Sequence, residues 1–243
     1  MAGAPRRTLA WVGPNDRLPD PSRAWPDPNG LLAAGADLSA ARLLEAYRQG
    51  IFPWYTEGQP VLWWSPDPRM VLYLDEFEAS RSLVKKVRRM RSGGHWRVTL
   101  DACFDRVMRE CAMPRADEDG TWITREIADA YSDLHRIDAA HSVEVWDGER
   151  LAGGLYGVSI GRMFFGESMF TRVPDASKVA LFALVQLLRR LGFRVIDCQQ
   201  NTRHLASLGA REIPRVSFLQ QVAELTRQPG PDWRATSIDL PDA

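Results

Sequence analysis

A chain of 243 residues, of which 45% are hydrophobic and nine are tryptophan, can bury a substantial core as one large domain or two small ones. It contains no apolar run near the roughly 18 residues that span a bilayer, and its start, MAGAPRRTLAWVG, lacks the apolar stretch of a secretory signal. Three cysteines without a C-x-x-C pair argue against a disulfide framework or a Cys-rich zinc site and favour a reduced, cytoplasmic setting.

The predicted elements at the beginning of the chain are few and are separated by prolines. Residues 1–30 are rich in Pro and Arg and predict an irregular arm. Ser39 precedes ARLLEAYRQG and predicts a capped helix that Gly50 ends. Residues 51–69 hold four prolines and several large aromatic side chains, which predicts a packed loop that lines a site. MVLYL, residues 70–74, predicts a strand.

The charges are unevenly spread although 31 basic and 31 acidic residues cancel. Residues 81–97, RSLVKKVRRMRSGGHWR, hold seven Lys or Arg and no Asp or Glu, and we call them the basic segment. They predict a helix that ends at Gly93-Gly94. Such a segment can dock a polyanion, but a solvated helix face explains its charge equally well.

The second half of the chain changes its pattern near residue 140. Before that point the sequence predicts the strand HWRVTL, the helix ACFDRVMRECAM and the helix REIADAYSDLHRI, which Thr124 can cap. Beyond it, Asp147-Gly148 and Gly161-Arg162 predict the turns of two hairpin steps. Next come a largely apolar helix opened by Asp175 or Ser177 and ended by Gly192, the strand FRVID, a short helix near 204–208 and the final helix VSFLQQVAELTR.

The predicted strand FRVID runs directly into the polar residues Asp197, Cys198 and Gln199. Because side chains alternate along a strand, Asp197 and Gln199 share one face and Cys198 points to the other. Asp197 could accept a hydrogen bond from the Gln199 NH2 group and so aim the amide oxygen outward. The alternatives are an Asp that caps the next turn beside a surface Gln, or a nucleophilic Cys198 assisted by His204.

Glu167 is a lone carboxylate among four large apolar residues in FFGESMF. Buried without a partner, it would cost several kcal/mol or take up a proton. It either pairs with Arg172 within the protein or receives a cationic ligand, and the sequence leaves both possibilities open.

The aromatic residues and histidines complete the candidates. Trp54, Trp63, Trp64 and Trp122 are ordinarily core residues, but the first three flank prolines and would suit the wall of an apolar pocket or a stacked base. The histidines show no metal-ligand spacing, which predicts no metal. No glycine-rich nucleotide loop opens a helix.

Longer blocks of the sequence resemble, in order, those of the leucyl/phenylalanyl-tRNA–protein transferases. They are PNGLLAAGADLSAARLLEAYRQGIFPWY, LWWSPDPR, GTWITREIADAY, HSVEVW, GGLYGVSIGRMFFGESMF and IDCQQNTRHLASLGAREIPR, and they run from about Asn29 to Arg215. The resemblance implies an α/β (α+β) fold. A small N-terminal α/β domain, with its arm at residues 1–75, would precede a GCN5-related N-acetyltransferase-like domain at 76–243.

The resemblance also implies an activity. A cytoplasmic, monomeric bacterial enzyme without a cofactor would move Leu or Phe, and in some cases Met, from aminoacyl-tRNA onto the α-amine of proteins that begin with Arg or Lys. The product would carry an N-degron for a Clp-type protease.

The resemblance further implies roles for single residues. Its catalytic pair falls on Asp197 and Gln199, and its acceptor-site carboxylate falls on Glu167. The site for the aminoacyl-adenosine end would be lined by Tyr47, Trp54, Trp122 and Tyr131, with Leu155 in the apolar pocket where relatives often have Met.

Two rival functions are a CoA-dependent N-acyltransferase of the same fold and a non-catalytic RNA-binding protein. A CoA pyrophosphate needs a glycine-rich turn before the helix that follows the hairpins, and TRVPDASK has a proline and an aspartate there instead. The RNA-binding alternative leaves Asp197, Gln199 and Glu167 without a role. For the transferase, phosphate contacts in the basic segment should hold the acceptor stem, and the candidates are Lys85, Lys86, Arg88, Arg89 and Arg91.

Overall fold

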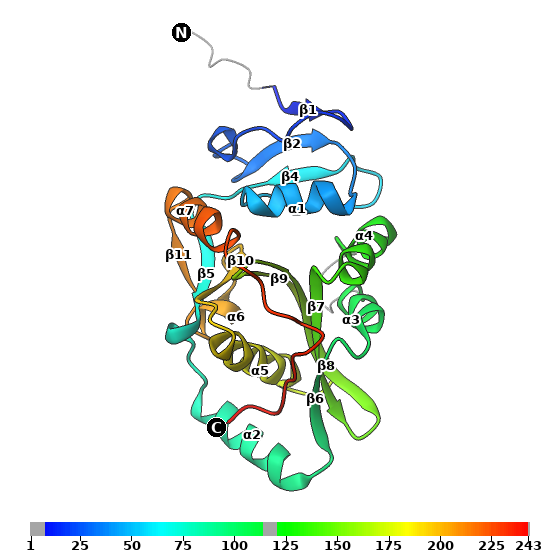
Figure 1. Ribbon diagram of the computed structural model, residues 1–243, viewed down its shortest axis with the longest axis vertical. Helices are drawn as coiled ribbons and strands as arrows, with labels where there is room; N and C mark the ends of the chain where they lie inside the picture. Colours follow the sequence, from blue (N-terminus) through cyan, green and yellow to red (C-terminus); the bar gives the residue numbers. More distant parts are fainter. Residues whose placement is uncertain (1–7, 114–120, 243) are drawn as a thin grey trace.

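The computed structural model describes residues 8–113 and 121–242, which form two sheets (Figure 1). The smaller sheet has the strand order β1-β2-β4-β3, and the larger has the order β11-β5-β10-β9-β8-β7-β6. The strands of the smaller sheet are β1 (Ala10–Val12), β2 (Leu31–Gly35), β3 (Phe52–Pro53) and β4 (Leu62–Trp64). Those of the larger sheet are β5 (Arg69–Tyr73), β6 (Trp96–Leu100), β7 (Ala140–Asp147), β8 (Arg150–Ile160), β9 (Met163–Thr171), β10 (Val195–Gln199) and β11 (Arg211–Ile213).

The helices begin and end at signals that are visible in the sequence. Ser39 and Thr124 accept hydrogen bonds from the backbone N–H three residues on, and Gly94 ends α2 in the left-handed conformation with φ 70°. The helices are α1 (Ala40–Arg48), α2 (Arg81–Gly93), α3 (Phe104–Cys111), α4 (Arg125–Arg136), α5 (Ala176–Arg190), α6 (Arg203–Ala206) and α7 (Arg215–Leu225), with short 3-10 turns η1 (Pro21–Arg23) and η2 (Leu74–Glu76).

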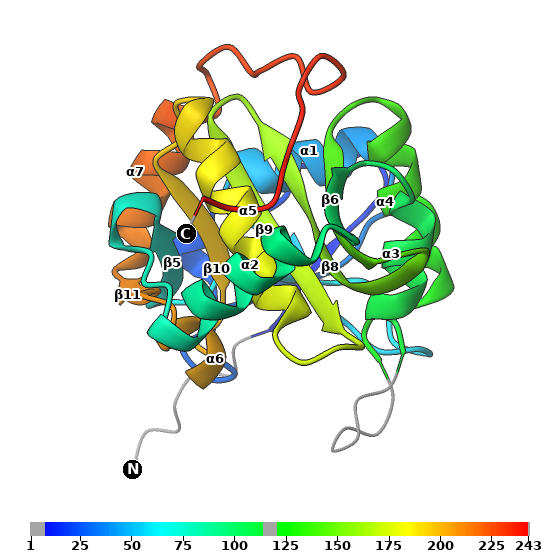
Figure 2. The same ribbon diagram turned by 90° about the horizontal axis from the view of Figure 1, so that it is seen from below.

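The larger sheet is covered on both faces. The apolar helix α5 packs on β7, β8 and β9 on one face, where α2 also lies. Figure 2 shows α5 lying across the sheet, with α1 of the N-terminal unit behind it. The other face carries α1, α3 and α4 in a second continuous core. A sheet buried on both faces requires apolar strands, and β8 is buried at every residue but its first.

The predicted α/β class, with a smaller unit ahead of a larger one, is confirmed. After residue 140 the order is hairpin-linked β7, β8 and β9, the buried helix α5, the strand β10 and the helices α6 and α7. This is the order expected of a GCN5-related N-acetyltransferase-like domain. None of the helices in the described part of the chain has the length and apolar character needed to cross a bilayer.

Two predictions for the first seventy residues were wrong. Residues 10–12 are not part of an irregular arm, because they form β1 and pair in parallel with β2 at Ala10–Ala33. The segment expected to be a packed loop contains β3 and β4, which pair at Phe52–Trp64. Both short strands are defined by pairing with a partner strand, which propensity does not register. Residues 1–7 of the expected arm lie outside the described residues.

The strand β5 lies within the range 1–75 that the sequence suggested for the smaller unit. It nevertheless pairs with β10 and β11 in the larger sheet, so the chain enters that sheet at Arg69. Where the smaller unit ends as a folding unit stays a prediction.

Candidate active site

The strands β9 and β10 separate shortly after they meet, and we call the resulting gap the β9–β10 opening. They pair in parallel at Phe164–Ile196 and Phe165–Asp197, and a cavity of about 870 Å³ lies beyond this point. Its walls come from both faces of the sheet, because Leu181 and Leu184 of α5 line it together with residues of the N-terminal unit. This volume is typical of a ligand site.

The predicted catalytic residue Asp197 lies at the β10 side of the opening and is fully buried. Its two carboxylate oxygens accept from Nε and NH2 of Arg69, at 2.8 and 2.6 Å. Arg69 is also fully buried, donates to the Gly50 carbonyl, and has its guanidinium over the rings of Phe52 and Phe218. A buried pair with this geometry is charge-balanced and fixed. Asp197 therefore presents no surface to a substrate in this conformation.

The predicted partner Gln199 follows a bulge in β10 and has φ 55°, in the left-handed region. Its backbone N–H donates to Asp197 Oδ1 at 3.0 Å. Its side-chain NH2 donates to Glu167 Oε1 at 3.1 Å, and not to Asp197 as the sequence led us to expect. Asp197 thus orients the backbone at Gln199, whereas Glu167 orients the amide.

Glu167 lies on β9, opposite Gln199, and is half-buried. The Tyr47 hydroxyl lies 2.7 Å from its Oε1, the Tyr131 hydroxyl lies 3.1 Å from its Oε2, and the two hydroxyls lie within hydrogen-bond distance of each other. Burial raises the pKa of Glu167 to about 7, further raised by the Asp197 charge, against the lowering effect of the tyrosine hydrogen bonds. Arg172, the alternative partner, instead pairs with Glu110 at 2.6 Å.

The residues predicted to line the aminoacyl-adenosine site divide into two groups. Trp54, Trp122 and Leu155 line the cavity, and Trp54 is 40% exposed. Tyr47 and Tyr131 are fully buried and lie behind Glu167, with burial raising the pKa of both hydroxyls well above the usual value. They therefore contact the site through Glu167.

Cys198 lies on the other face of β10, as strand alternation predicted. It belongs to the core on the α5 face, whereas Asp197 lies against Arg69. Burial first, and then the Asp197 charge, raises the pKa of the thiol well above its usual range. A thiol kept protonated in this way is a poor nucleophile. His204, considered as its base, lies on α6 at the same cavity.

The basic segment forms α2, at the end of the molecule away from the smaller sheet (Figure 1). Lys85, Arg88 and Arg89 are exposed. Lys86 contacts Asp175 at 3.6 Å, and Arg91 donates to the Pro241 carbonyl and forms an ion pair with Asp242. The five candidates thus lie on one helix, and at least two of them are already engaged within the protein.

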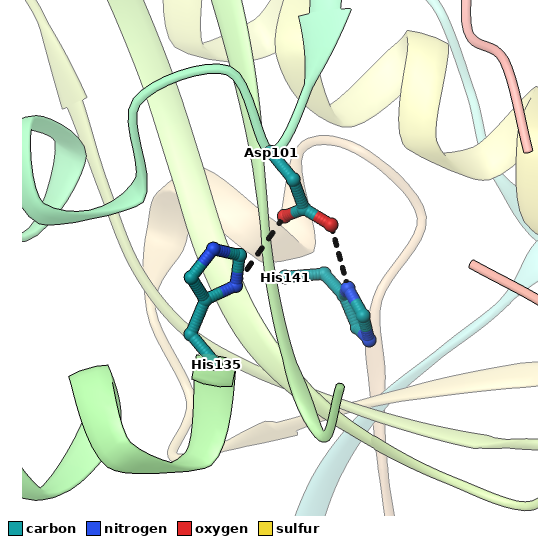
Figure 3. Close-up of side chains that lie close together, drawn as sticks. All are labelled: Asp101, His135 and His141. Atoms are coloured by element: carbon teal, nitrogen blue, oxygen red, sulfur yellow. Dashed lines mark hydrogen bonds and ion pairs between the residues drawn. The ribbon is translucent and has the colours of Figure 1, made fainter. Parts of the chain in front are cut away.

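The fold also brings together Asp101, His135 and His141, whose sequence spacing predicted no metal site (Figure 3). His141 Nδ1 hydrogen-bonds Asp101 at 2.8 Å, and His135 Nδ1 donates to the Ala140 carbonyl at 2.8 Å. His141 is buried and stacks on Trp233 at 4.1 Å. Because these ring nitrogens are used in hydrogen bonds, the cluster fastens α4 to β6 and β7 as it stands. The absence of a metal stays a prediction.

Arg69, which holds Asp197 in place, was not predicted from the sequence. The available signal was weak: a basic residue directly before the apolar run MVLYL, in a proline-rich segment. Its partner Asp197 lies 128 residues away, so local patterns do not connect the two.

Comparison with known proteins identifies the family. A model described as leucyl/phenylalanyl-tRNA protein transferase matches residues 71–223, and a model of that family's N-terminal domain matches 36–67. Relatives named leucyl/phenylalanyl-tRNA–protein transferase include those of Bordetella petrii, 54% identical over 95% of this chain and 93% of the relative, and Pseudomonas fluorescens, 56% identical over 91% and 96%.

Solved structures are more distant. L-PGS from Bacillus licheniformis is 12% identical, with a TM-score of 0.39 over 86% of this chain and 66% of that one. At such low similarity it indicates neither ligand nor activity. The family models and the relatives over almost the full length agree with each other. The chain belongs to the leucyl/phenylalanyl-tRNA protein transferase family.

Proposed function

We propose that this protein moves Leu or Phe from aminoacyl-tRNA to the α-amine of proteins that begin with Arg or Lys. The observation that carries the proposal is the β9–β10 opening, where a large cavity joins an apolar wall to Glu167 and Gln199. The family to which the chain belongs supports the same activity. We take the enzyme to act as a cytoplasmic monomer.

The aminoacyl end of the tRNA would occupy the apolar part of the cavity. Leu155 and Ile196 from the sheet, together with Leu184 of α5, form a wall suited to a Leu or Phe side chain. Trp54 and Trp122 line another part of the cavity and offer faces on which the terminal adenine can stack.

The acceptor protein would place its first residue against Glu167. A carboxylate in a partly buried, low-dielectric position favours a cationic side chain strongly over a neutral one. Arg172, at the same cavity, is neutralised by Glu110 and so does not oppose the approach of a cation.

The reaction is aminolysis of an ester that is already activated. The α-amine nitrogen forms a bond to the ester carbonyl carbon, the bond from that carbon to the ribose oxygen breaks, and the proton lost from the amine balances the proton gained by the ribose hydroxyl. The Gln199 amide oxygen would accept a hydrogen bond from the attacking amine and aim its lone pair. Asp197 and Arg69 are positioning residues, because they hold the backbone of Gln199 and do not touch the substrate.

The exposed residues of α2 would contact phosphates of the tRNA. Replacing Lys85, Arg88 and Arg89 together by Gln should weaken binding at low salt. The plot of log affinity against log salt should flatten by about one unit of slope for each phosphate that the variant no longer neutralises. The measurement is tRNA binding over a salt series. A triple variant with an unchanged slope would remove α2 from the interface.

The activity is tested directly with Leu-tRNA labelled on leucine and a peptide that begins with Arg. Label should move to the peptide, and an otherwise identical peptide with a blocked α-amine should receive none. Acetyl-CoA serves as the rival donor. Asp175 at the start of α5 occupies the place where an acetyltransferase of this fold would bind pyrophosphate. Acetyl transfer with no leucyl transfer would overturn the proposal.

A further inference from the structure

Three oxygen-bearing groups form a closed triangle at Glu167. Tyr47 contacts Oε1, Tyr131 contacts Oε2, and the two hydroxyls contact each other, which makes three hydrogen bonds. Two neutral tyrosines supply two protons, so an ionised Glu167 would leave one contact between oxygens without a proton. A proton on Glu167 supplies the third and satisfies every edge of the triangle.

The charges around the triangle also favour a protonated Glu167. The groups that face Glu167 are Tyr47 of α1, Tyr131 of α4, Tyr156 of β8, Asp197 of β10 and Arg69 of β5. The three tyrosines are neutral because burial raises their pKa values well above the usual range. Asp197 and Arg69 cancel within one buried ion pair.

An ionised Glu167 would therefore have no dedicated cation among these neighbours. The site is nearly neutral when Glu167 carries a proton, and it gains a net negative charge when that proton leaves. The raised pKa of Glu167, about 7, agrees with the proton count.

We propose that Glu167 is a neutral acid in the empty site and that it releases its proton to solvent when the cationic first residue of an acceptor protein binds. The inference rests on the proposed function for the identity of the acceptor. The incoming guanidinium or ammonium group supplies the missing positive charge and replaces the proton. The acceptor carries its cation into the site, and the acid loses H⁺ to water, so charge is conserved across the exchange.

The exchange would sharpen acceptor selection. An acceptor with a neutral first side chain does not stabilise the ionised form and meets a protonated Glu167. A cationic side chain meets a carboxylate that it has itself caused to ionise. Selectivity for Arg and Lys should therefore increase as pH rises through about 7, because less of the binding energy is then used to remove the proton.

Isothermal calorimetry measures the proton directly. An Arg-starting peptide is titrated into the enzyme in buffers of different ionisation enthalpy, and the slope gives the protons released. With a pKa of about 7, Glu167 should release about 0.9 proton at pH 6 and about 0.1 at pH 8. Protons lost from the peptide amine are removed by subtracting the result for Glu167→Gln. Binding without any release at pH 6 would overturn the proposal.

Infrared spectroscopy tests the empty enzyme and needs no acceptor. A protonated carboxyl band should be present at pH 6, should be lost in Glu167→Gln, and should disappear when the Arg peptide binds. Glu144→Gln is the matched control. Glu144 is a second buried carboxyl whose pKa is raised by burial, but it is held by Ser142 and Thr99 on β7 and β6.

The two proposals fail in different ways. An enzyme that shows the Glu167 band but does not transfer leucine keeps the protonated acid and loses the proposed function. An enzyme that transfers leucine but lacks the band keeps the function and loses this inference.

Discussion

The two sides of the β9–β10 opening each present a carboxylate, and their surroundings differ in kind. On the β10 side, Asp197 is fully buried and accepts hydrogen bonds from Nε and Nη2 of the Arg69 guanidinium. On the β9 side, Glu167 is half-buried and surrounded by hydroxyl and amide donors. A permanent cation fixes the charge of the first, whereas the groups that contact the second are neutral.

Under the proposed function, this difference separates a residue that supports the site from a residue that recognises the acceptor. A buried ion pair is costly to break, so Asp197 and Arg69 maintain the shape of the strand end on which Gln199 sits. Because the hydrogen-bond donors around Glu167 are neutral, they do not fix its protonation state, which can change when a ligand binds. Gln199 joins the two sides, because its backbone N–H donates a hydrogen bond to Asp197 and its side-chain amide donates one to Glu167.

Removing the cation from the β10 side should have the largest effect. Arg69→Met leaves Asp197 buried without its partner and should lower the free energy of unfolding by about 3–5 kcal/mol. Urea denaturation measures the change. The double variant Arg69→Met with Asp197→Leu should recover much of the loss, because it leaves no unpaired charge. A single variant as stable as the wild type would show that the pair is not the anchor we describe.

Breaking the link between the two sides should slow the chemistry. Gln199→Ala removes the amide oxygen that we propose aims the amine, and it should lower kcat about 10- to 100-fold with little change in affinity for tRNA. Asp197→Ala should also lower kcat, but it leaves Arg69 buried without its partner and so lowers stability as well. Equal losses of rate and tRNA affinity in Gln199→Ala would indicate a binding residue.

Neutralising the β9 side should change acceptor selection more than turnover. Glu167→Gln keeps the shape of the side chain but cannot ionise, so kcat/KM for an Arg-starting peptide should fall about tenfold or more. A peptide that starts with Ala should be affected much less. Competition between the two peptides gives the ratio of their kcat/KM values, and Glu144→Gln should leave this ratio unchanged. A uniform loss for both peptides would argue against a role in recognition.

The smallest effect is expected at the side chain between the two polar residues of β10. Cys198→Ser keeps the size of a thiol that burial holds protonated in the α5 core, so the transfer rate should stay within about twofold of the wild type. Labelled leucine transfer measures it. Loss of activity from a variant that folds normally would reopen the nucleophile hypothesis.

Local signals allowed much of the fold to be predicted. Helix starts at Ser39 and Thr124 and the stop at Gly94 depend on side chains within a few residues, which a sequence displays directly. The short strands β1 and β3 were missed because pairing with a partner strand, and not propensity, makes them strands.

The candidate site could likewise be predicted only in part. Alternation along β10 placed Cys198 correctly, and the resemblance of longer blocks identified Asp197, Gln199 and Glu167 as the residues to examine. The partners of these residues were not predictable, since Arg69 lies 128 residues from Asp197, and Tyr47 lies 120 residues from Glu167. Tertiary folding decides such contacts.

The left-handed backbone at Gln199 restricts how this enzyme can be redesigned. Few residues other than glycine adopt φ 55° easily, and β-branched residues are strongly disfavoured there. Libraries that seek new acceptors should therefore vary the β9 side and keep Gln199, whose amide the proposed reaction uses. Substitution by Val, Ile or Thr would distort the main chain at this position. A loss of activity in such a variant would therefore not report on the chemistry of the new side chain.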